Sequence, residues 1–306
     1  MQTLNTEEMK TRHRWFGEQQ RFKLMLIAPA ATLLLLFQVM PIIIGANASF
    51  RDWALNNPKK TWVGLSQYVS VLTDPAFLQI VLPNTFVFMV ASVALSLAAG
   101  FALALALNRP FRGQKLVQTV LLVPLMVAPV IAAIMVRWMF NDQFGIVNVV
   151  LEAIGLESQP WLTQRWSAFA IIVLTDTWLW TPWFVLLLLA GLQSLPKAPF
   201  EAAAIDGTSA WRVFRHLTVP MLAPVIVVCI VIRSIDAFRT FDIVWALTGG
   251  GPARQTQLFS LYAYEQAFVF LNFGKGSAAA IVGGVIIMVV GLTLYRVLDR
   301  VVKASQ

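Results

Sequence analysis

Charged side chains inside apolar stretches are the residues of this sequence with the greatest capacity for chemistry. One apolar stretch carries four of them at intervals of three residues: Arg233, Asp236, Arg239 and Asp242. A second stretch carries Asp176, with Trp178 and Trp180 close behind it. Ionisable groups are costly in an apolar environment, so they are retained where they pair with one another or serve a polar ligand. Residues three apart are neighbours on a helix, so the spacing predicts one helical stripe of alternating charge.

Two interpretations of these residues stay open. The stripe is either a self-neutralising ladder that packs against neighbouring helices, or a set of groups that line a pathway. In the second case its donors and acceptors suit the hydroxyl groups of a neutral polyhydroxylated molecule, and tryptophan rings supply flat apolar faces. One helix cannot turn Trp178, Trp180 and Trp183 all to the same side. The residues we select as candidate contacts are Asn84, Asp176, Trp178, Trp180, Asp236, Arg239 and Asp242.

The motifs of the common enzyme classes are absent from the sequence. It contains no Gly-x-x-x-x-Gly-Lys-[Ser/Thr] phosphate-binding loop, no Gly-x-Ser-x-Gly and no His-Glu-x-x-His. His13, His216 and Cys229 are its only histidines and cysteine, so a metal centre built from these residue types is not expected. An active site of paired carboxylates is the remaining alternative. We therefore predict a chain that is not itself an enzyme and that binds no metal or cofactor.

The elements that position these residues follow from composition. Of the 306 residues, 58% are hydrophobic and 12% are charged, whereas soluble domains average about 45–50% apolar and about 25% charged residues. The apolar residues form six blocks, at 24–48, 84–107, 116–138, 167–190, 219–247 and 277–298. Each block is long enough to cross a hydrocarbon core of about 30 Å, and helices satisfy the backbone there. The first block is too long for a signal peptide, so we predict an all-α polytopic membrane protein with six transmembrane helices.

The distribution of lysine and arginine predicts the orientation of the chain. Of the 23 basic residues, 14 lie in four alternate segments, 1–23, 108–115, 191–218 and 296–306. Another 6 lie in the segments between them, 49–83, 139–166 and 246–276. Basic residues favour the cytoplasmic side, which predicts both termini in the cytoplasm. The predicted organisation is a cytoplasmic segment 1–23, a six-helix domain 24–298 and a cytoplasmic tail 299–306.

The cytoplasmic loop 193–220 is unlike an ordinary connection. Pro199 suits the first turn of a helix, and Glu201 suits the positive end of its dipole. Three alanines follow, and Gly207 is expected to end the helix. Ser209 or its neighbour Thr208 is expected to cap a second short helix. The alanine face either allows close approach of another protein or lies in the membrane interface, and the residues alone leave both readings open.

The spacing of this loop resembles a known family motif. Glu201-Ala202-Ala203, three residues, Gly207, nine residues and Leu217-Thr218-Val219-Pro220 are similar to the EAA loop in permease subunits of bacterial ABC importers. The family pattern has Ile at the position of Leu217 and Leu at the position of Val219, which are conservative departures. The resemblance extends over nearly the whole chain. The segment 236–252 is similar to the fifth-span region of the carbohydrate branch, which includes the maltose and glycerol-phosphate importers.

The resemblance implies a fold and a role. The fold would be that of a type I ABC importer permease, with a cytoplasmic coupling helix in loop 193–220. The chain would be a non-catalytic subunit in the bacterial inner membrane. It would form half of the pathway for a sugar, polyol or related solute and would work by alternating access. The residues that would dock an ATPase are Glu201, Ala202, Ala203, Asp206 and Gly207.

The resemblance also implies partners. These are a second, non-identical permease, two ATPase subunits that carry ATP and Mg, and an extracytoplasmic solute-binding protein, with membrane lipid around the helices and no nucleic acid. Two alternatives stay open: a permease for an amino acid or peptide, and an ion-coupled secondary carrier that works without an ATPase. The particular sugar or polyol is not predicted.

Overall fold

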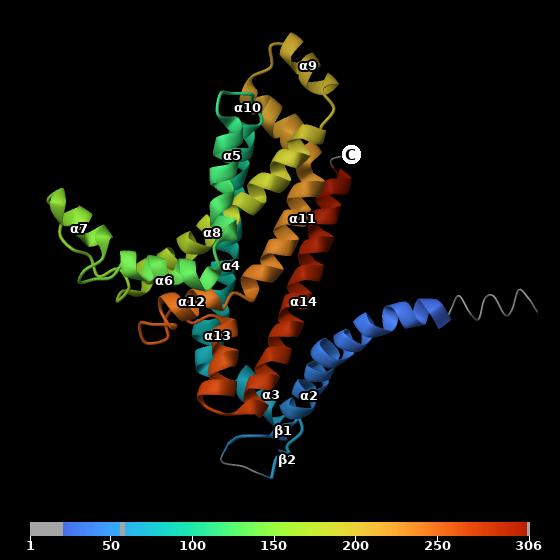
Figure 1. The fold of residues 1–306 in the computed structure, drawn as a ribbon, viewed down its shortest axis with the longest axis vertical. Coiled ribbons are helices and arrows are strands. Elements are labelled where there is room, and N and C mark those ends of the chain that lie inside the picture. The colour runs from blue at the N-terminus through green and yellow to red at the C-terminus, as the bar shows by residue number, and fades with distance from the viewer. Residues whose placement is uncertain (1–20, 56–58, 305–306) are drawn as a thin grey trace, which may run out of the picture.

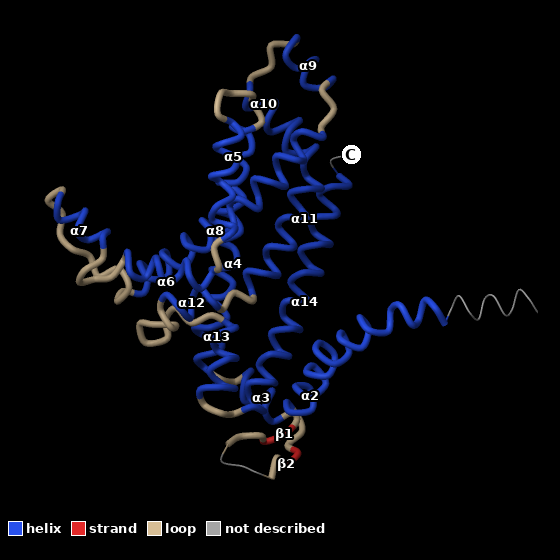
Figure 2. The backbone as a smooth tube through the Cα atoms, viewed as in Figure 1, coloured by secondary structure: helices blue, strands red, loops and turns tan. Residues whose placement is uncertain are grey.

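The computed structural model describes residues 21–55 and 59–304, with side chains of the last helix described up to residue 296. The predicted segment 1–23 lies almost wholly outside the described residues, and the predicted tail 299–306 lies partly outside them. Figure 1 and Figure 2 show that the described chain is mostly helix. In this part of the chain, one two-stranded antiparallel sheet pairs β1 (Arg51–Asp52) with β2 (Thr61–Trp62).

Within the described residues, five helices are long and apolar enough to cross a membrane. The first is the N-terminal helix Arg21–Ser49, which ends in η1 (Leu35–Val39) and α2 (Met40–Ser49), and the second is Phe77–Leu107, made of η2 (Phe77–Val81) and α4 (Leu82–Leu107). The third is α8 (Arg165–Ser194). The fourth is Ala210–Phe238, made of α10 (Ala210–Val213), η4 (Phe214–Thr218) and α11 (Val219–Phe238), and the fifth is α14 (Phe273–Ala304). Continuous helices satisfy their own backbone groups, as a lipid environment requires. The prediction of an all-α polytopic membrane protein is confirmed.

The predicted span 116–138 is not one straight helix. It consists of α5 (Gln114–Leu122), η3 (Val123–Met126) and α6 (Pro129–Met139), and the two halves are bent by 94°. Pro124 lacks the N–H that a continuing helix needs, and Pro129 forces Ala128 into an extended conformation. The count of six spans therefore holds only if this bent pair crosses the membrane as one unit.

The predicted span 219–247 is also divided. Its first part, α11, ends at Phe238, and α12 (Asp242–Leu247) begins after a short break. The prediction of one uninterrupted stripe of four charges is therefore wrong, because Asp242 belongs to a different helix. An acidic residue in the first turn is stabilised by the positive end of the helix dipole, and Asp242 occupies that place in α12.

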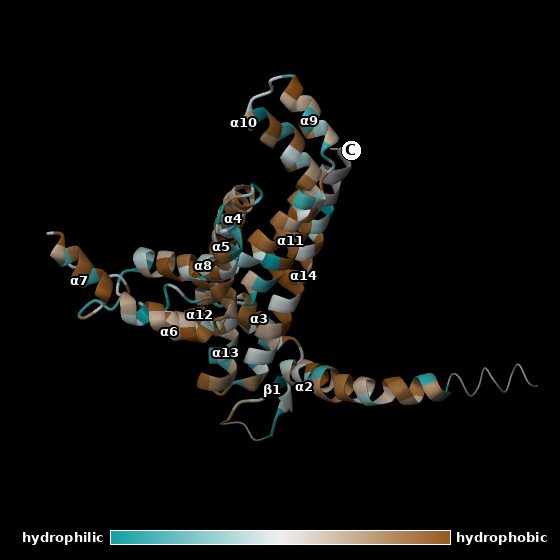
Figure 3. Cartoon of the chain, turned by 45° about the horizontal axis from the view of Figure 1, so that its top comes forward, coloured by the Kyte–Doolittle hydropathy of each residue, from teal (hydrophilic) through white to brown (hydrophobic). Residues whose placement is uncertain are grey.

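The packed core forms where α4 and α8 cross. The two backbones approach closely at Gly100, where an added Cβ would lie 2.4 Å from the Cβ of Phe184. Small residues permit such approaches between helices that cross a membrane. Helix α11 packs against α4, α8 and α14, and buries the aromatic ring of Phe238 against Phe86 and Phe259. Figure 3 shows that hydrophobic residues predominate along these long helices.

The elements gather at two ends and one side (Figure 1). The loop helix α9 (Ala198–Ile205) and the C-terminal end of α14 lie at one end, which we call the α9 end. At the opposite end, the hairpin end, lie β1, β2 and α3 (Ser66–Leu72). Helices α6 and α7 (Ile146–Ala153) project sideways, and the N-terminal helix leaves the bundle on the other side. The remaining elements near the hairpin end are α13 (Phe259–Tyr264) and η5 (Glu265–Val269).

A polar cluster ties three elements together at the hairpin end. Oδ2 of Asp74 accepts hydrogen bonds from the Tyr262 hydroxyl at 2.8 Å and from Lys275 Nζ at 3.0 Å. Partial burial acts to raise the pKa of Asp74, but the hydrogen bonds from Lys275 and Tyr262 and the lysine charge outweigh it. The pKa of Asp74 is therefore lowered from its ordinary value of 3.8. We call these three residues the hairpin-end clasp.

Candidate functional site

Arg233 lies at the centre of a buried polar cluster where α4, α8 and α11 meet. Its Nη2 donates to the carboxylate of Asp176 on α8 and, at 3.3 Å, to the hydroxyl of Ser92 on α4. Its Nη1 lies 3.0 Å from Oδ2 of Asp236, one turn further along α11. The guanidinium carbon lies 4.6 Å from the ring centroid of Trp180. Both Arg233, 1% exposed, and Asp176, 0% exposed, are removed from solvent.

The cluster is almost fully paired, with two exceptions. Oδ2 of Asp176 accepts hydrogen bonds from both Ser92 and Arg233. Its other oxygen, Oδ1, and the Nε of Arg233 have no hydrogen-bond partner among the described residues. Buried polar atoms without a partner are rare in folded proteins, and they often mark a functional place. The carboxylate of Asp176 therefore keeps the capacity to accept one further hydrogen bond.

A cavity of about 330 Å³ lies next to this cluster. It is lined by Pro129, Asp176, Trp180, Asp236, Arg239, Thr240, Phe241, Asp242 and Ile243. The volume falls within the range of about 300–1,000 Å³ that is usual for small-ligand pockets. The break between α11 and α12 shapes the cavity, because it brings both helix ends and the residues between them onto one wall. The site thus combines carboxylates, a guanidinium and an indole ring.

Five of the seven predicted contact residues line this cavity, and two do not. Asn84 donates from its side-chain amide to the backbone oxygen of Gln255 at 2.7 Å and is buried. It ties the start of α4 to the loop that precedes α13. Trp178 faces a separate apolar cavity of about 280 Å³, which Phe140 and Trp161 also line. Trp178 and Trp180 therefore lie on different faces of α8, and only Trp180 belongs to the site.

The selection of contact residues from the sequence missed Arg233 and Ser92. Arg233 was recognised as part of the charged stripe, but its role as the centre of the cluster depends on a carboxylate from another helix. A serine within an apolar span gives no signal by itself. Ser92, Ser96 and Gly100 are spaced by four on α4, and this small-residue face is the pattern that marks a close helix contact.

The loop at the α9 end folds largely as expected. Pro199 lies in the first turn of α9, Glu201 follows it, and Gly207 adopts a φ of +60° just beyond the helix end. A left-handed residue at this position is the common way to end a helix, and glycine adopts it without strain. Ser209 precedes α10, but its side chain makes no capping hydrogen bond, so the expectation of a side-chain cap is wrong.

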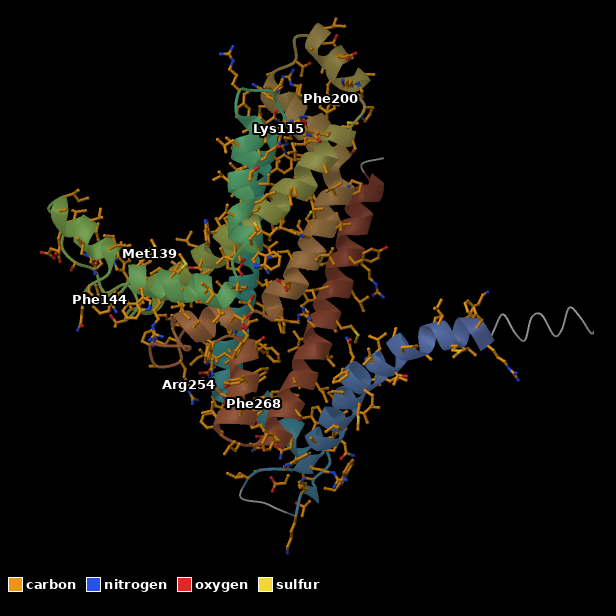
Figure 4. All side chains as sticks on the ribbon, in the orientation of Figure 1. Lys115, Met139, Phe144, Phe200, Arg254 and Phe268 are labelled. Atoms are coloured by element: carbon orange, nitrogen blue, oxygen red, sulfur yellow. The ribbon has the colours of Figure 1, made fainter. Side chains whose placement is uncertain are left out.

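The predicted docking residues divide into two groups. Glu201, Ala202, Asp206 and Gly207 are exposed, whereas Ala203 is buried. The inner side of α9 lies over a cavity of about 800 Å³ that is lined mainly by apolar and aromatic side chains, including those of Phe200, Ala204, Leu105, Trp211 and Phe214. Figure 4 shows Phe200 on α9, at the end of the molecule far from Arg254 and Phe268. The outer side of α9 is available for contact with another protein.

Comparison with known proteins agrees with this architecture. Residues 96–304 match the family described as "Binding-protein-dependent transport system inner membrane component". The trehalose/maltose transport system permease protein MalF of Thermococcus litoralis is 37% identical over 267 residues, which cover 86% of this chain and 89% of that protein. The sulfoquinovosyl glycerol transport system permease protein SmoG of Agrobacterium fabrum is 35% identical over 287 residues, 93% of each chain.

A further relative and a solved structure extend the comparison. The sn-glycerol-3-phosphate transport system permease protein UgpA of Brucella suis is 34% identical over 281 residues, which cover 92% of this chain and 95% of that protein. A chain in the crystal structure of a bacterial ABC transporter involved in the import of the acidic polysaccharide alginate superposes with a TM-score of 0.82 at 25% identity, covering 94% of this chain and 99% of that one.

The fold, the loop at the α9 end and these matches lead to one conclusion. The family model covers more than half of the chain, and relatives above 30% identity align along most of its length. The superposition with the alginate transporter confirms the permease fold that the EAA-like loop predicts. This chain therefore belongs to the family of binding-protein-dependent transport system inner membrane components, the permease subunits of ABC importers.

Proposed function

We propose that this chain forms half of the pathway by which an ATP-driven importer carries a sugar, polyol or related polyhydroxylated solute across the bacterial inner membrane. The observation that carries the proposal is the cavity beside Arg233, which joins hydrogen-bonding groups to an indole ring in one space. The relatives support the solute class, because their names refer to trehalose and maltose, sulfoquinovosyl glycerol and sn-glycerol-3-phosphate. The names of these relatives refer to no amino acid or peptide.

The cavity suits a sugar in its chemistry. Solute hydroxyls donate to the carboxylates of Asp236 and Asp242 and to the side of Asp176 that lines the cavity, and they accept from Arg239. The ring of Trp180 packs against the apolar C–H face of the solute, as indole rings do with amphipathic ligands. None of these contacts is covalent or metal-mediated. Binding of this kind is reversible, as a transport site requires.

The coupling of transport to ATP hydrolysis is assigned to the outer side of α9. The exposed residues Glu201, Ala202, Asp206 and Gly207 form the surface that docks an ATPase subunit, which carries ATP and Mg. The loop continues directly into the helix Ala210–Phe238, which holds Arg233 and Asp236 near its far end. At 1.5 Å per residue, Arg233 lies about 35 Å along this helix from Ala210. A displacement of α9 thus reaches the cavity through one continuous helix, as part of a switch between two packings.

The proposal includes an orientation and partners. The α9 end faces the cytoplasm, and the hairpin end faces outward, where a solute-binding protein delivers the solute. The alginate relative has been solved in complex with a pentasaccharide-bound periplasmic protein, which supports this assignment. A second, non-identical permease completes the pathway, and two ATPase subunits bind below. Both termini of this chain then lie in the cytoplasm.

A pair of tryptophan variants on one helix tests the proposal. In the purified importer reconstituted with its binding protein, we expect Trp180→Ala to reduce ATP-dependent sugar uptake about thirtyfold, because loss of a central aromatic contact costs about 2 kcal/mol. Trp178→Ala is the matched control, since Trp178 lies two residues away and outside the cavity. Equal uptake by both variants at equal membrane levels would exclude this cavity as part of the solute pathway. Uptake without any ATPase subunit would instead support a secondary carrier.

A further inference from the structure

The named solutes of the relatives fall into two chemical classes. Trehalose and maltose are uncharged, whereas sn-glycerol-3-phosphate and alginate are anionic. Membership of the family therefore leaves the charge of the solute open. The electrostatics of the cavity beside Arg233 address this question directly, because a site for an anion needs convergent donors of positive charge.

The wall of the cavity carries more negative than positive charge. Among the residues that line it, the carboxylates are those of Asp176, Asp236 and Asp242, and the cation is Arg239. Arg233 lies behind this wall and is 1% exposed. Even when Arg233 is counted with the lining residues, three carboxylates face two guanidinium groups. An anionic solute would therefore enter a space of net negative charge.

Each guanidinium has a carboxylate of the protein beside it. Both Nη atoms of Arg233 are directed to protein partners: Nη1 to Asp236, and Nη2 to Asp176 and Ser92. Nη2 of Arg239 lies 3.9 Å from Oδ1 of Asp236, although the side chain is 69% exposed. Forked recognition of a phosphate or carboxylate requires two donors of one guanidinium to converge on the ligand. In Arg233 both Nη atoms are already taken by protein partners, and the charge of Arg239 is offset by the neighbouring Asp236.

The helix end at the cavity also carries a carboxylate. The N-terminal turn of a helix attracts anions through its free N–H groups and its dipole. In α12, the first residue of this turn is Asp242, whose negative charge occupies that position. By contrast, hydrogen-bond acceptors are abundant: Oδ1 of Asp176 has no partner, and Asp236 is 37% exposed. Acceptors of this kind bind the O–H groups of an uncharged solute.

We infer that the cavity selects uncharged polyhydroxylated solutes over anionic ones, and that Asp242 and Asp236 are the residues that determine this preference. The inference rests on the proposed function, since it concerns the same cavity. It places this chain, by the chemistry of its site, with importers of neutral sugars or polyols. Repulsion between like charges is the physical cause, and it acts mainly by excluding the wrong solute.

Binding of matched solute pairs tests the inference. The importer is purified through a tag on this chain, placed in lipid nanodiscs without its binding protein, and examined by saturation-transfer difference NMR, which detects weak binding. The probes are glycerol and glycerol 3-phosphate, glucose and glucose 6-phosphate, and trehalose and trehalose 6-phosphate. For the pair that binds best, we expect the phosphorylated member to bind about tenfold more weakly than the neutral one.

Charge variants assign the effect to the cavity. Asp242→Asn is expected to raise the binding of the phosphorylated probe relative to the neutral probe, and Arg239→Gln is expected to lower it. Glu157→Gln removes an exposed charge outside the cavity and serves as the control, with an unchanged ratio.

The possible failures are distinguishable. Equal or tighter binding of the phosphorylated probe by the unaltered importer overturns the inference while the proposed function stands. An unchanged ratio in Asp242→Asn overturns the assignment of Asp242 in the same way. Absence of binding by all six probes, or neutral-probe binding that Trp180→Ala leaves intact, overturns the proposed function and the inference together.

Discussion

At the scale of the residue, Arg233 concentrates several interactions that are usually separate. It forms ion pairs with Asp176 and Asp236, a hydrogen bond with Ser92 and a cation–π contact with Trp180. A buried ion pair gains little net stability over apolar residues of similar volume, but removal of one partner leaves the other charge uncompensated. The value of the cluster therefore lies in how it positions α4, α8 and α11 around the cavity.

A double substitution tests whether Arg233 and Asp176 compensate each other's charge. We expect Arg233→Leu to destabilise the protein by about 3–5 kcal/mol, because Asp176 is then left charged and buried. Combining it with Asp176→Leu should restore much of that stability, while sugar uptake stays low. The measurement is thermal unfolding of the purified protein in detergent. Additive destabilisation in the double variant would show that the two side chains act independently and would contradict their mutual compensation.

The hairpin-end clasp predicts a dependence of stability on pH. Because the pKa of Asp74 is lowered in the folded protein, its ionised form adds stability that is present above the ordinary value of 3.8 and is lost as pH falls through the folded pKa. Burial and the neighbouring carboxylate raise the pKa of Tyr262 above its ordinary 10.0, so its hydroxyl remains a donor at neutral pH.

The corresponding variant is Asp74→Asn. We expect its unfolding temperature to be lower than that of the unaltered protein at neutral pH, with the gap closing below about pH 4. Thermal unfolding followed at several pH values measures this difference. Asp142→Asn serves as a comparison, because that aspartate lies in another loop and contacts Leu162 and Thr163 instead. A constant gap across the pH range would exclude the clasp as its source.

At the scale of the element, the crossing of α4 and α8 leaves no room for a side chain at Gly100. We expect Gly100→Ala to destabilise the protein by about 1–3 kcal/mol, because the added methyl group meets the Cβ of Phe184, which cannot move without shifting α8. Gly284→Ala is the matched control on α14, where an added Cβ meets nothing within 4 Å. Equal unfolding temperatures for the two variants would contradict the close packing.

The sequence predicted the elements better than their interruptions. Long apolar blocks identify membrane helices reliably, because lipid permits few other structures. The bend at Pro124 and Pro129 was within reach of sequence reasoning, since both residues disfavour a continuing helix. The break after Phe238 had no such signal, because no proline or glycine lies within 239–241. The pairing of Arg233 with Asp176 joins residues from separate helices and depends on their packing.

At the scale of the whole molecule, the proposed docking surface for the ATPase lies on the outer side of α9. We expect Ala202→Trp to prevent co-purification of the ATPase subunits while the permease remains folded, because Ala202 is exposed on the outer side. Ala153→Trp makes the same change at an exposed position of α7, far from α9, and should leave co-purification intact (Figure 1). Normal amounts of ATPase with Ala202→Trp would exclude this face as the docking surface.

The unbroken helix Ala210–Phe238 has a consequence for rotational phase. It connects the loop to the cavity as one continuous helix. The number of residues between the loop and the cavity therefore sets their relative rotation about the helix axis. One extra residue midway would turn one end against the other by about 100° while lengthening the helix by only about 1.5 Å. The cavity and the loop would each keep their own contacts, but the same displacement of α9 would then act on the cavity from a different direction. Under the proposed coupling, the length of this helix matters for transport independently of the side chains along it.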